Sequence, residues 1–90
     1  MLRNLILLQI KMKVGNARLH NWRIGLTHDV DERRKHWTET EKLDTRQWES
    51  WQADSLTDAQ DLEASFILEG MQGGTGGNLS PWKDVFVYVF

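Results

Sequence analysis

Apolar residues follow strand-like patterns in two stretches near the ends of the chain. Between residues 4 and 14 both alternating faces begin apolar, which predicts an interior strand covered on both sides. Gly15-Asn16 is a turn signal, since both residues tolerate positive φ, so we expect residues 19–26 to return as the hairpin partner. Residues 84–90 alternate strictly, with Val85, Val87 and Val89 on one face and Phe86, Tyr88 and Phe90 on the other. They predict a further strand that either joins the same sheet or pairs with a second copy of the chain.

Two other stretches carry helix signals. Asp29 is a good N-cap, and Glu32 three residues later completes a capping-box-like pattern, which predicts a helix from about residue 30 to residue 36. A second and better-defined helix is expected before Gly70, which is a typical C-terminal stop. Thr57 is the expected N-cap of this second helix.

The sequence pattern does not decide the secondary structure of the segments around these helices. Residues 38–44 are polar and fit a short solvated helix or a loop. Trp48 and Trp51 are three residues apart, which fits a helix as well as a strand. Residues 71–80 contain a glycine run without a following P-loop lysine, which is more typical of a connector than of a phosphate-binding loop.

These elements predict a single α+β domain over residues 1–90. We expect a small antiparallel sheet of roughly three to four strands, flanked by two to three helices. Its core is expected in residues 4–70, followed by a glycine-rich connector at 71–80 and an extra C-terminal strand at 84–90. A chain of 90 residues can bury only about 60–70% of its unfolded surface, so this core is small.

Composition narrows the classes of protein that the chain can belong to. It has no cysteine, which excludes a disulfide framework and a thiolate metal site. The longest apolar run, at residues 5–8, is far too short to span a bilayer, and lysines at 11 and 13 interrupt any signal-peptide pattern. We therefore expect no membrane partner and a cytoplasmic location.

Charge is distributed unevenly between the two parts of the chain. Residues 1–36 carry eight Lys or Arg against three Asp or Glu, and residues 37–90 carry three against ten. The basic part could offer a surface to phosphates, or the two parts could neutralise each other in the fold.

Two charged residues fall on apolar helical faces. Arg33 or Arg34 lies between Val30 and Trp37 on one face, where an arginine stem often packs while its head reaches water. Glu63 interrupts the apolar stripe of the second helix, and a carboxylate there needs a compensating partner. A salt bridge, a position at the edge of the stripe and a metal ligand are all compatible with the spacing.

The chain resembles the GIY-YIG nuclease family in three places. Ile24-Gly25-Leu26-Thr27 is similar to the family's second strand, and Arg33 stands eight residues after the glycine, as the family arginine does. Ala59-x-x-x-Glu63 is similar to the family's metal-binding helix. The resemblance also favours a strand at residues 46–54. Arg23 occupies the tyrosine position of the second strand, and the family's Gly-Ile-Tyr strand would fall near residues 10–12, where neither glycine nor tyrosine stands.

The resemblance implies metal-assisted hydrolysis of a phosphodiester in DNA or RNA. It assigns Glu63 to a Mg²⁺ or Mn²⁺ ion and Arg33 to the charge on the phosphate oxygens. The family's tyrosines act as the base, and the only tyrosine, Tyr88, lies on a strand without a counterpart in the motif. His28 is therefore the first candidate substitute, with His20 and Lys11 as further ones. Contacts to nucleic acid are expected from Lys11, Arg23 and Arg34.

Three functions remain open from the sequence. The first is a GIY-YIG-like nuclease whose active site is degenerate. The second is a related module that binds nucleic acid or protein without cleaving it, in which Arg33 and Glu63 could form a buried ion pair. The third is a structural domain that forms a homodimer through its last strand.

Overall fold

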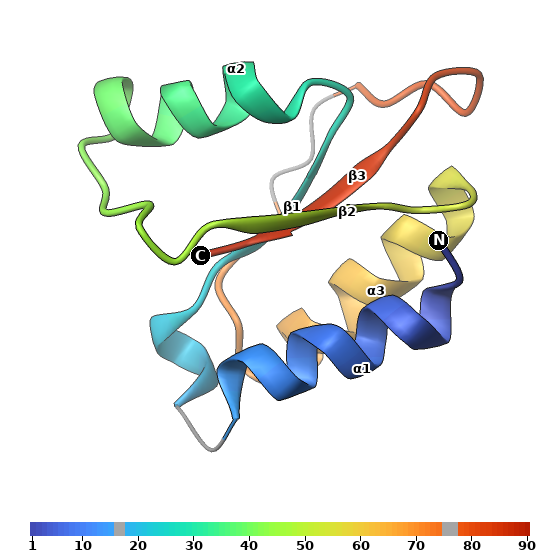
Figure 1. The fold of residues 1–90 in the computed structure, drawn as a ribbon, viewed down its shortest axis with the longest axis horizontal. Coiled ribbons are helices and arrows are strands. Elements are labelled where there is room, and N and C mark those ends of the chain that lie inside the picture. Colours follow the sequence, from blue (N-terminus) through green and yellow to red (C-terminus); the bar gives the residue numbers. More distant parts are fainter. Residues whose placement is uncertain (16–17, 75–77) are drawn as a thin grey trace.

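The computed structural model describes residues 1–15, 18–74 and 78–90, and its architecture is α+β. The strands are β1 (Ile24–Thr27), β2 (Glu49–Gln52) and β3 (Phe86–Val89). They form an antiparallel sheet in the order β1-β3-β2 (Figure 1). The predicted small antiparallel sheet with flanking helices is therefore confirmed.

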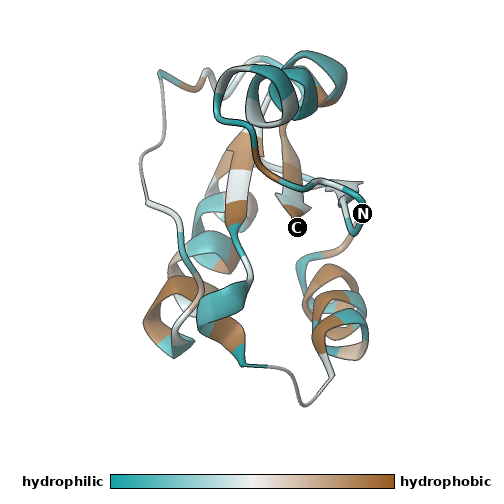
Figure 2. Ribbon diagram, turned by 90° about the vertical axis from the view of Figure 1, so that its left-hand side faces the viewer, coloured by the Kyte–Doolittle hydropathy of each residue, from teal (hydrophilic) through white to brown (hydrophobic). Residues whose placement is uncertain are grey.

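Helices cover both faces of this sheet. Helices α1 (Arg3–Val14) and α3 (Leu56–Glu69) lie side by side on one face, and α2 (Val30–Lys35) lies on the other (Figure 1). The main core fills the space between the sheet and the α1–α3 layer, and Figure 2 shows that α2 is the most hydrophilic of the three helices. The largest fully buried side chains are Ile6, Ile10, Ile24, Leu62, Phe66, Val85, Val87 and Val89.

Residues 3–14 form a helix, so the predicted N-terminal strand is wrong. Ile6, Ile10 and Val14 are buried at the four-residue spacing of a helical face. The segment consists mostly of leucine, lysine, methionine and glutamine, which are good helix formers, and Gly15 ends it with a φ of 55°. The predicted hairpin is therefore also wrong, because η1 (Leu19–Asn21) is a 3₁₀ turn and β1 pairs with β3.

β3 is the central strand of the sheet and not an addition to it. Its predicted alternation is confirmed: Val87 and Val89 belong to the main core, while Tyr88 faces α2 and the loop before β2. Both edges of β3 are hydrogen-bonded to strands of the same chain. A homodimer through this strand stays a prediction, and it would have to displace β1 or β2.

The signals at the helix ends give mixed results. Asp29 caps α2 as predicted, accepting from the backbone N–H of Glu32 at 3.1 Å, and a π-helical turn, η2 (His36–Thr40), extends the helix. α3 begins two residues earlier than expected, because Ser55, and not Thr57, accepts from the N–H of Asp58. Gly70 ends α3 with a φ of 124°, as predicted. Asn16 of the predicted turn and residues 75–77 of the glycine run lie outside the described residues.

Candidate functional site

A pocket of about 170 Å³ lies beside β1 and is lined by residues of α2 and η2 and by one residue of α3. It brings together the two residues that the family resemblance singled out, Arg33 from α2 and Glu63 from α3. Tyr88 from β3 joins them. The complete lining consists of Arg23, Ile24, Gly25, Leu26, Arg33, His36, Trp37, Glu41, Glu63, Gly73, Gly74 and Tyr88.

Glu63 and Arg33 share this pocket without pairing. No hydrogen bond or ion pair joins their side chains, and neither side chain forms one with any other part of the chain that the structure describes. Both residues are only partly exposed. Burial raises the pKa of the Glu63 carboxyl above its usual value, because loss of water disfavours the charged form. The interpretation of these residues as a buried ion pair is therefore not supported.

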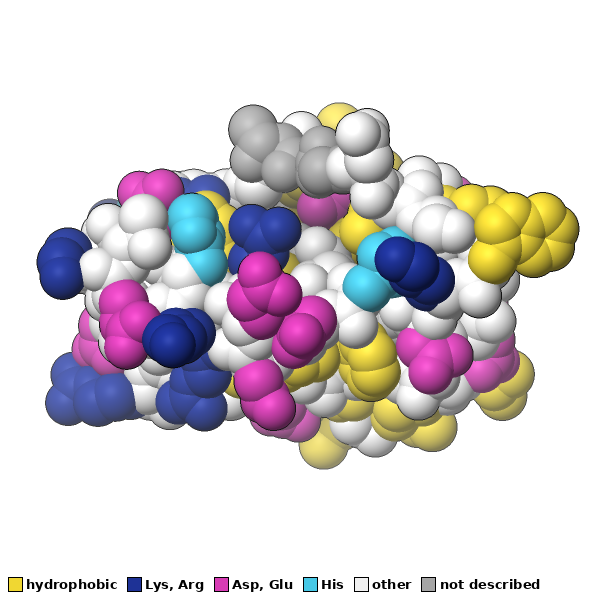
Figure 3. All heavy atoms as spheres, turned by 90° about the horizontal axis from the view of Figure 1, so that it is seen from above, with side chains coloured by type: hydrophobic (Ala, Val, Ile, Leu, Met, Phe, Trp, Pro, Cys, Tyr) yellow, Lys and Arg dark blue, Asp and Glu magenta, His cyan; other side chains and the backbone are white. Residues whose placement is uncertain are grey.

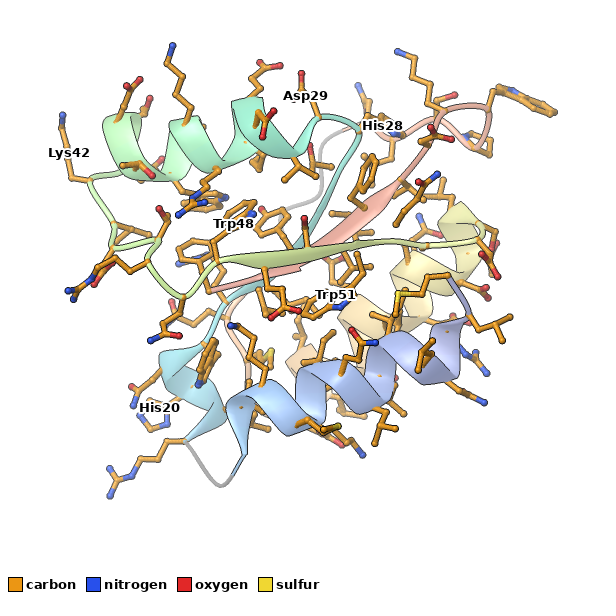
Figure 4. The ribbon with its side chains drawn as sticks, in the orientation of Figure 1. His20, His28, Asp29, Lys42, Trp48 and Trp51 are labelled. Carbon is orange, nitrogen blue, oxygen red and sulfur yellow. The ribbon has the colours of Figure 1, made fainter. Side chains whose placement is uncertain are left out.

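The ring of Tyr88 lies directly against β1 because the residue paired with it across the sheet is a glycine. Gly25 and Tyr88 are paired in the sheet, and a Cβ atom added to Gly25 would lie 2.2 Å from the Tyr88 hydroxyl oxygen. The absence of a side chain at Gly25 thus lets the tyrosine ring lie directly over the strand. On the α2 side of the sheet, where Figure 4 places Trp48, the indole of Trp48 stacks on the tyrosine ring with centroids 4.4 Å apart and planes 11° apart.

The hydroxyl of Tyr88 is hydrogen-bonded to Trp37, and nearby charges affect its pKa. The indole N–H of Trp37 donates to this hydroxyl at 2.9 Å. Burial raises the pKa of Tyr88 above 10.0, while the Trp37 hydrogen bond and the guanidinium groups of Arg33 and Arg23 act in the opposite direction. Glu63 adds to the upward shift because its negative charge disfavours a phenolate.

Sequence reasoning dismissed Tyr88 because its strand follows all the elements that resemble the family. The structure places this strand beside β1, the position expected for residues 4–14. The sequence carried one usable signal, a lone tyrosine in a strictly alternating aromatic strand. The partner of that strand, sixty residues earlier, could not be derived from alternation, because the pattern fixes faces and not neighbours.

His28 is not among the residues that line this pocket. Its Nδ1 lies 2.7 Å from the carbonyl oxygen of Asp84, and its Nε2 accepts from the backbone N–H of Ser80 at 2.8 Å. These two partners require the neutral tautomer with the proton on Nδ1. His28 lines a neighbouring pocket of about 400 Å³, which shares Leu26, Arg33 and His36 with the first. His28 thus joins the end of β1 to the segment before β3.

The three predicted nucleic-acid contacts are dispersed. Arg23 lines the Tyr88 pocket, donates to the Gln72 side chain at 3.0 Å and lies 4.6 Å from the centre of the Trp37 ring. Arg34 instead donates to the backbone oxygen of Thr45 at 3.0 Å and holds the loop after η2. Lys11 is exposed on α1, on the other side of the sheet. His20, the other substitute considered, also lies on the α1 side (Figure 4).

The basic N-terminal part of the chain does not form one surface. Arg3 and Lys13 on α1 form ion pairs with Asp61 and Glu49, which belong to the acidic part. On the opposite side of the molecule, Figure 3 shows basic and acidic side chains interspersed over the α2 face. Part of the positive charge of the N-terminal part is therefore neutralised by carboxylates of the acidic part.

Two carboxylates line this pocket, those of Glu41 and Glu63, and Glu41 lies 3.5 Å from His36. Within residues 1–15, 18–74 and 78–90, no three His, Asp or Glu side chains are close enough to hold an ion by themselves. Mg²⁺ commonly binds through one or two carboxylates, with waters and substrate phosphates completing its shell. Glu63, half-buried and without a partner among the described residues, fits that mode of binding.

No helix in the described ranges has both the length and the apolar character needed to cross a membrane. Comparisons with known family models, curated proteins and solved structures found no match for the chain.

Proposed function

We propose that the chain is a GIY-YIG-like domain that hydrolyses a phosphodiester of DNA or RNA with a divalent metal ion. Glu63 would hold the metal ion, Arg33 would bind the phosphate and Tyr88 would act as the base. The observation that carries the proposal is a half-buried carboxylate and a guanidinium that share a pocket with a tyrosine hydroxyl but do not pair with each other.

A carboxylate and a guanidinium that do not pair with each other favour a ligand that carries both positive and negative charge. A partly buried carboxylate or guanidinium costs stability unless something completes its interactions. A guanidinium is well suited to phosphate oxygens, and a carboxylate is well suited to Mg²⁺ or Mn²⁺. A metal-bound phosphodiester offers both partners at once, so it accounts for Arg33 and Glu63 together.

The three side chains have complementary roles in the proposed reaction. When bound at Glu63, the metal ion supplies Lewis-acid stabilisation of negative charge on the leaving oxygen. Arg33 donates to the non-bridging phosphate oxygens. Tyr88, as a phenolate, takes a proton from a water molecule while the water oxygen bonds to phosphorus and the bond to the leaving oxygen breaks. The leaving oxygen then takes a proton from solvent.

Cleavage assays on single-stranded, duplex and branched DNA and on RNA test the proposal. With Mg²⁺ or Mn²⁺, Glu63→Gln, Arg33→Ala and Tyr88→Phe are each expected to lower the cleavage rate by about 10²–10³-fold. Glu69→Gln is the matched control, because Glu69 is exposed on the same helix. The native rate should also rise about tenfold per pH unit toward alkaline pH, because the raised pKa of Tyr88 keeps its base form scarce at neutral pH. A native rate that Glu63→Gln leaves unchanged would contradict the proposal.

The same raised pKa favours one alternative, a module that binds nucleic acid without cleaving it. A tyrosine that stays protonated at neutral pH is a donor and a poor base. In this case Arg33→Ala would weaken a salt-sensitive binding to nucleic acid, and no substrate would yield product with either metal ion.

A further inference from the structure

We propose that Trp37 is a positioning residue that orients the Tyr88 hydroxyl toward the pocket shared by Arg33 and Glu63. The inference rests on the proposed function, in which Tyr88 acts as the base. It concerns a residue that neither the sequence patterns nor the family resemblance singled out for a role in the site.

The hydrogen bond has only one possible direction. An indole N–H is a donor without acceptor capacity, so the Trp37 contact at 2.9 Å occupies a lone pair of the Tyr88 oxygen. The phenolic proton must therefore point away from Trp37. The guanidinium groups of Arg23 and Arg33 cannot accept it, so among the side chains and solvent of the pocket its acceptor is a carboxylate, a ring nitrogen of His36 or an incoming water molecule.

The helix itself directs Trp37 to this position. Trp37 and Arg33 are four residues apart, so both face the sheet from the same side. Trp37 lies in the π-helical turn η2, and such wider turns inside helices are frequent at functional sites. One helical segment thus supplies both the group that binds the phosphate and the group that orients the base.

The indole is in turn fixed by its neighbours. The guanidinium of Arg23 lies 4.6 Å from the centre of the Trp37 ring, and Phe90 packs against the ring with centroids 5.6 Å apart. Trp48 and Gly25 hold the two faces of the tyrosine ring. Donor and acceptor are both immobilised, so the direction of the hydrogen bond is maintained as the phenol ionises.

The hydrogen bond from Trp37 should change the pKa of the Tyr88 hydroxyl, and this change can be measured. A donor to the phenolic oxygen stabilises the phenolate more than the phenol. Removing the N–H while keeping an aromatic ring should therefore raise the pKa of Tyr88. Tyr88 is the only tyrosine of the chain, so the ultraviolet absorbance of tyrosinate reports this residue alone.

The experiment is a spectrophotometric pH titration of the native chain and of Trp37→Phe, with circular dichroism at each pH to follow the fold. We expect the tyrosinate midpoint of Trp37→Phe to lie about one pH unit above that of the native chain. Trp82→Phe is the matched control, because Trp82 is 92% exposed, and its midpoint should equal the native one. Trp37→His, which keeps an N–H donor, should titrate close to the native midpoint.

Equal midpoints in Trp37→Phe and the native chain would overturn the proposal, and so would equal displacements in Trp37→Phe and Trp37→His. The native chain provides a second measurement that needs no folded variant. In ¹⁵N-labelled protein, one tryptophan indole N–H resonance should shift downfield with the same midpoint as tyrosinate formation, and its absence would also overturn the proposal. Neither measurement requires cleavage, so failure of the proposed nuclease activity and failure of this inference are distinguishable.

Discussion

Gly25 and Tyr88 depend on each other across the sheet. The tyrosine ring occupies the space that any side chain at Gly25 would need, and the same placement brings the hydroxyl to Arg33 and Glu63. The glycine thus serves the site through the residue that it admits. Trp37 and Trp48 complete this arrangement by hydrogen bonding and stacking.

Glu63 is expected to reduce the stability of the fold that contains it. The raised pKa means that the folded chain holds the carboxyl proton more firmly than the unfolded chain does. The native chain therefore loses stability as pH rises through that pKa, whereas Glu63→Gln does not. At pH 7 Glu63→Gln should be more stable, by about 0.5 kcal/mol or less because the group is partly screened by solvent.

Thermal denaturation followed by circular dichroism checks this expectation at neutral and at acidic pH. The advantage of Glu63→Gln should disappear well below the usual carboxyl pKa of 4.5, where the native side chain is also neutral. Glu39→Gln is the control, because Glu39 is exposed and pairs with Lys35 at 3.9 Å, so its loss should not stabilise the chain. A native chain as stable as Glu63→Gln at pH 7 would show that Glu63 has a compensating partner.

At the scale of elements, two helix-end signals and the strict alternation of β3 were good guides, whereas the apolar run near the N-terminus was not. Asp29 and Gly70 correctly predicted where α2 begins and where α3 ends, because capping is a local interaction. Residues 3–14 were misread because the apolar residues, which occupy seven of the 12 positions, are spaced in a way that satisfies both a helical and a strand period. Only the packing of Ile6 and Ile10 against the core decides between them.

The sequence predicted two residues of the candidate site and missed a third. Arg33 and Glu63 lie in segments that keep the family's order, so the resemblance indicated both residues, and the structure places them in one pocket. Tyr88 comes from a strand whose place in the sheet depends on tertiary pairing. His28 was a reasonable candidate by residue type, but the backbone groups that occupy both of its ring nitrogens are visible only in the fold.

His28 is expected to act as a tether between β1 and the segment before β3. His28→Ala removes two hydrogen bonds to that segment, which should cost about 1–2 kcal/mol of stability and speed chymotryptic cleavage at Trp82. Limited proteolysis followed by mass spectrometry measures the effect, with His20→Ala as the control. If His28 were instead a catalytic base, His28→Ala would abolish cleavage of nucleic acid without a change in proteolysis.

At the scale of the whole molecule, the sheet depends on its central strand. β1 and β2 each pair with β3 and not with each other, so the two strands belong to one sheet only through it. Val85, Val87 and Val89 of this segment are also among the most buried residues of the main core. Residues 84–90 are therefore required for the fold, although the resemblance to the family ends before them.

Deletion of residues 85–90 should abolish cooperative unfolding. The truncated chain would leave the edges of β1 and β2 unpaired and remove three valines from the core. Thermal and urea denaturation followed by tryptophan fluorescence are the measurements. Adding a peptide of residues 84–90 should restore part of the native signal. A truncated chain that unfolds cooperatively without the peptide would show that β3 is dispensable.

The position of β3 also governs how the chain can fold while it is being made. A ribosome synthesises β1 and β2 well before the strand that pairs with both of them. The three helices can begin to form from local interactions during synthesis, but the sheet must wait until nearly all 90 residues have been translated. A nascent chain that stalls before Phe86 exposes two unpaired strands, and such strands are templates for aggregation and for chaperone binding.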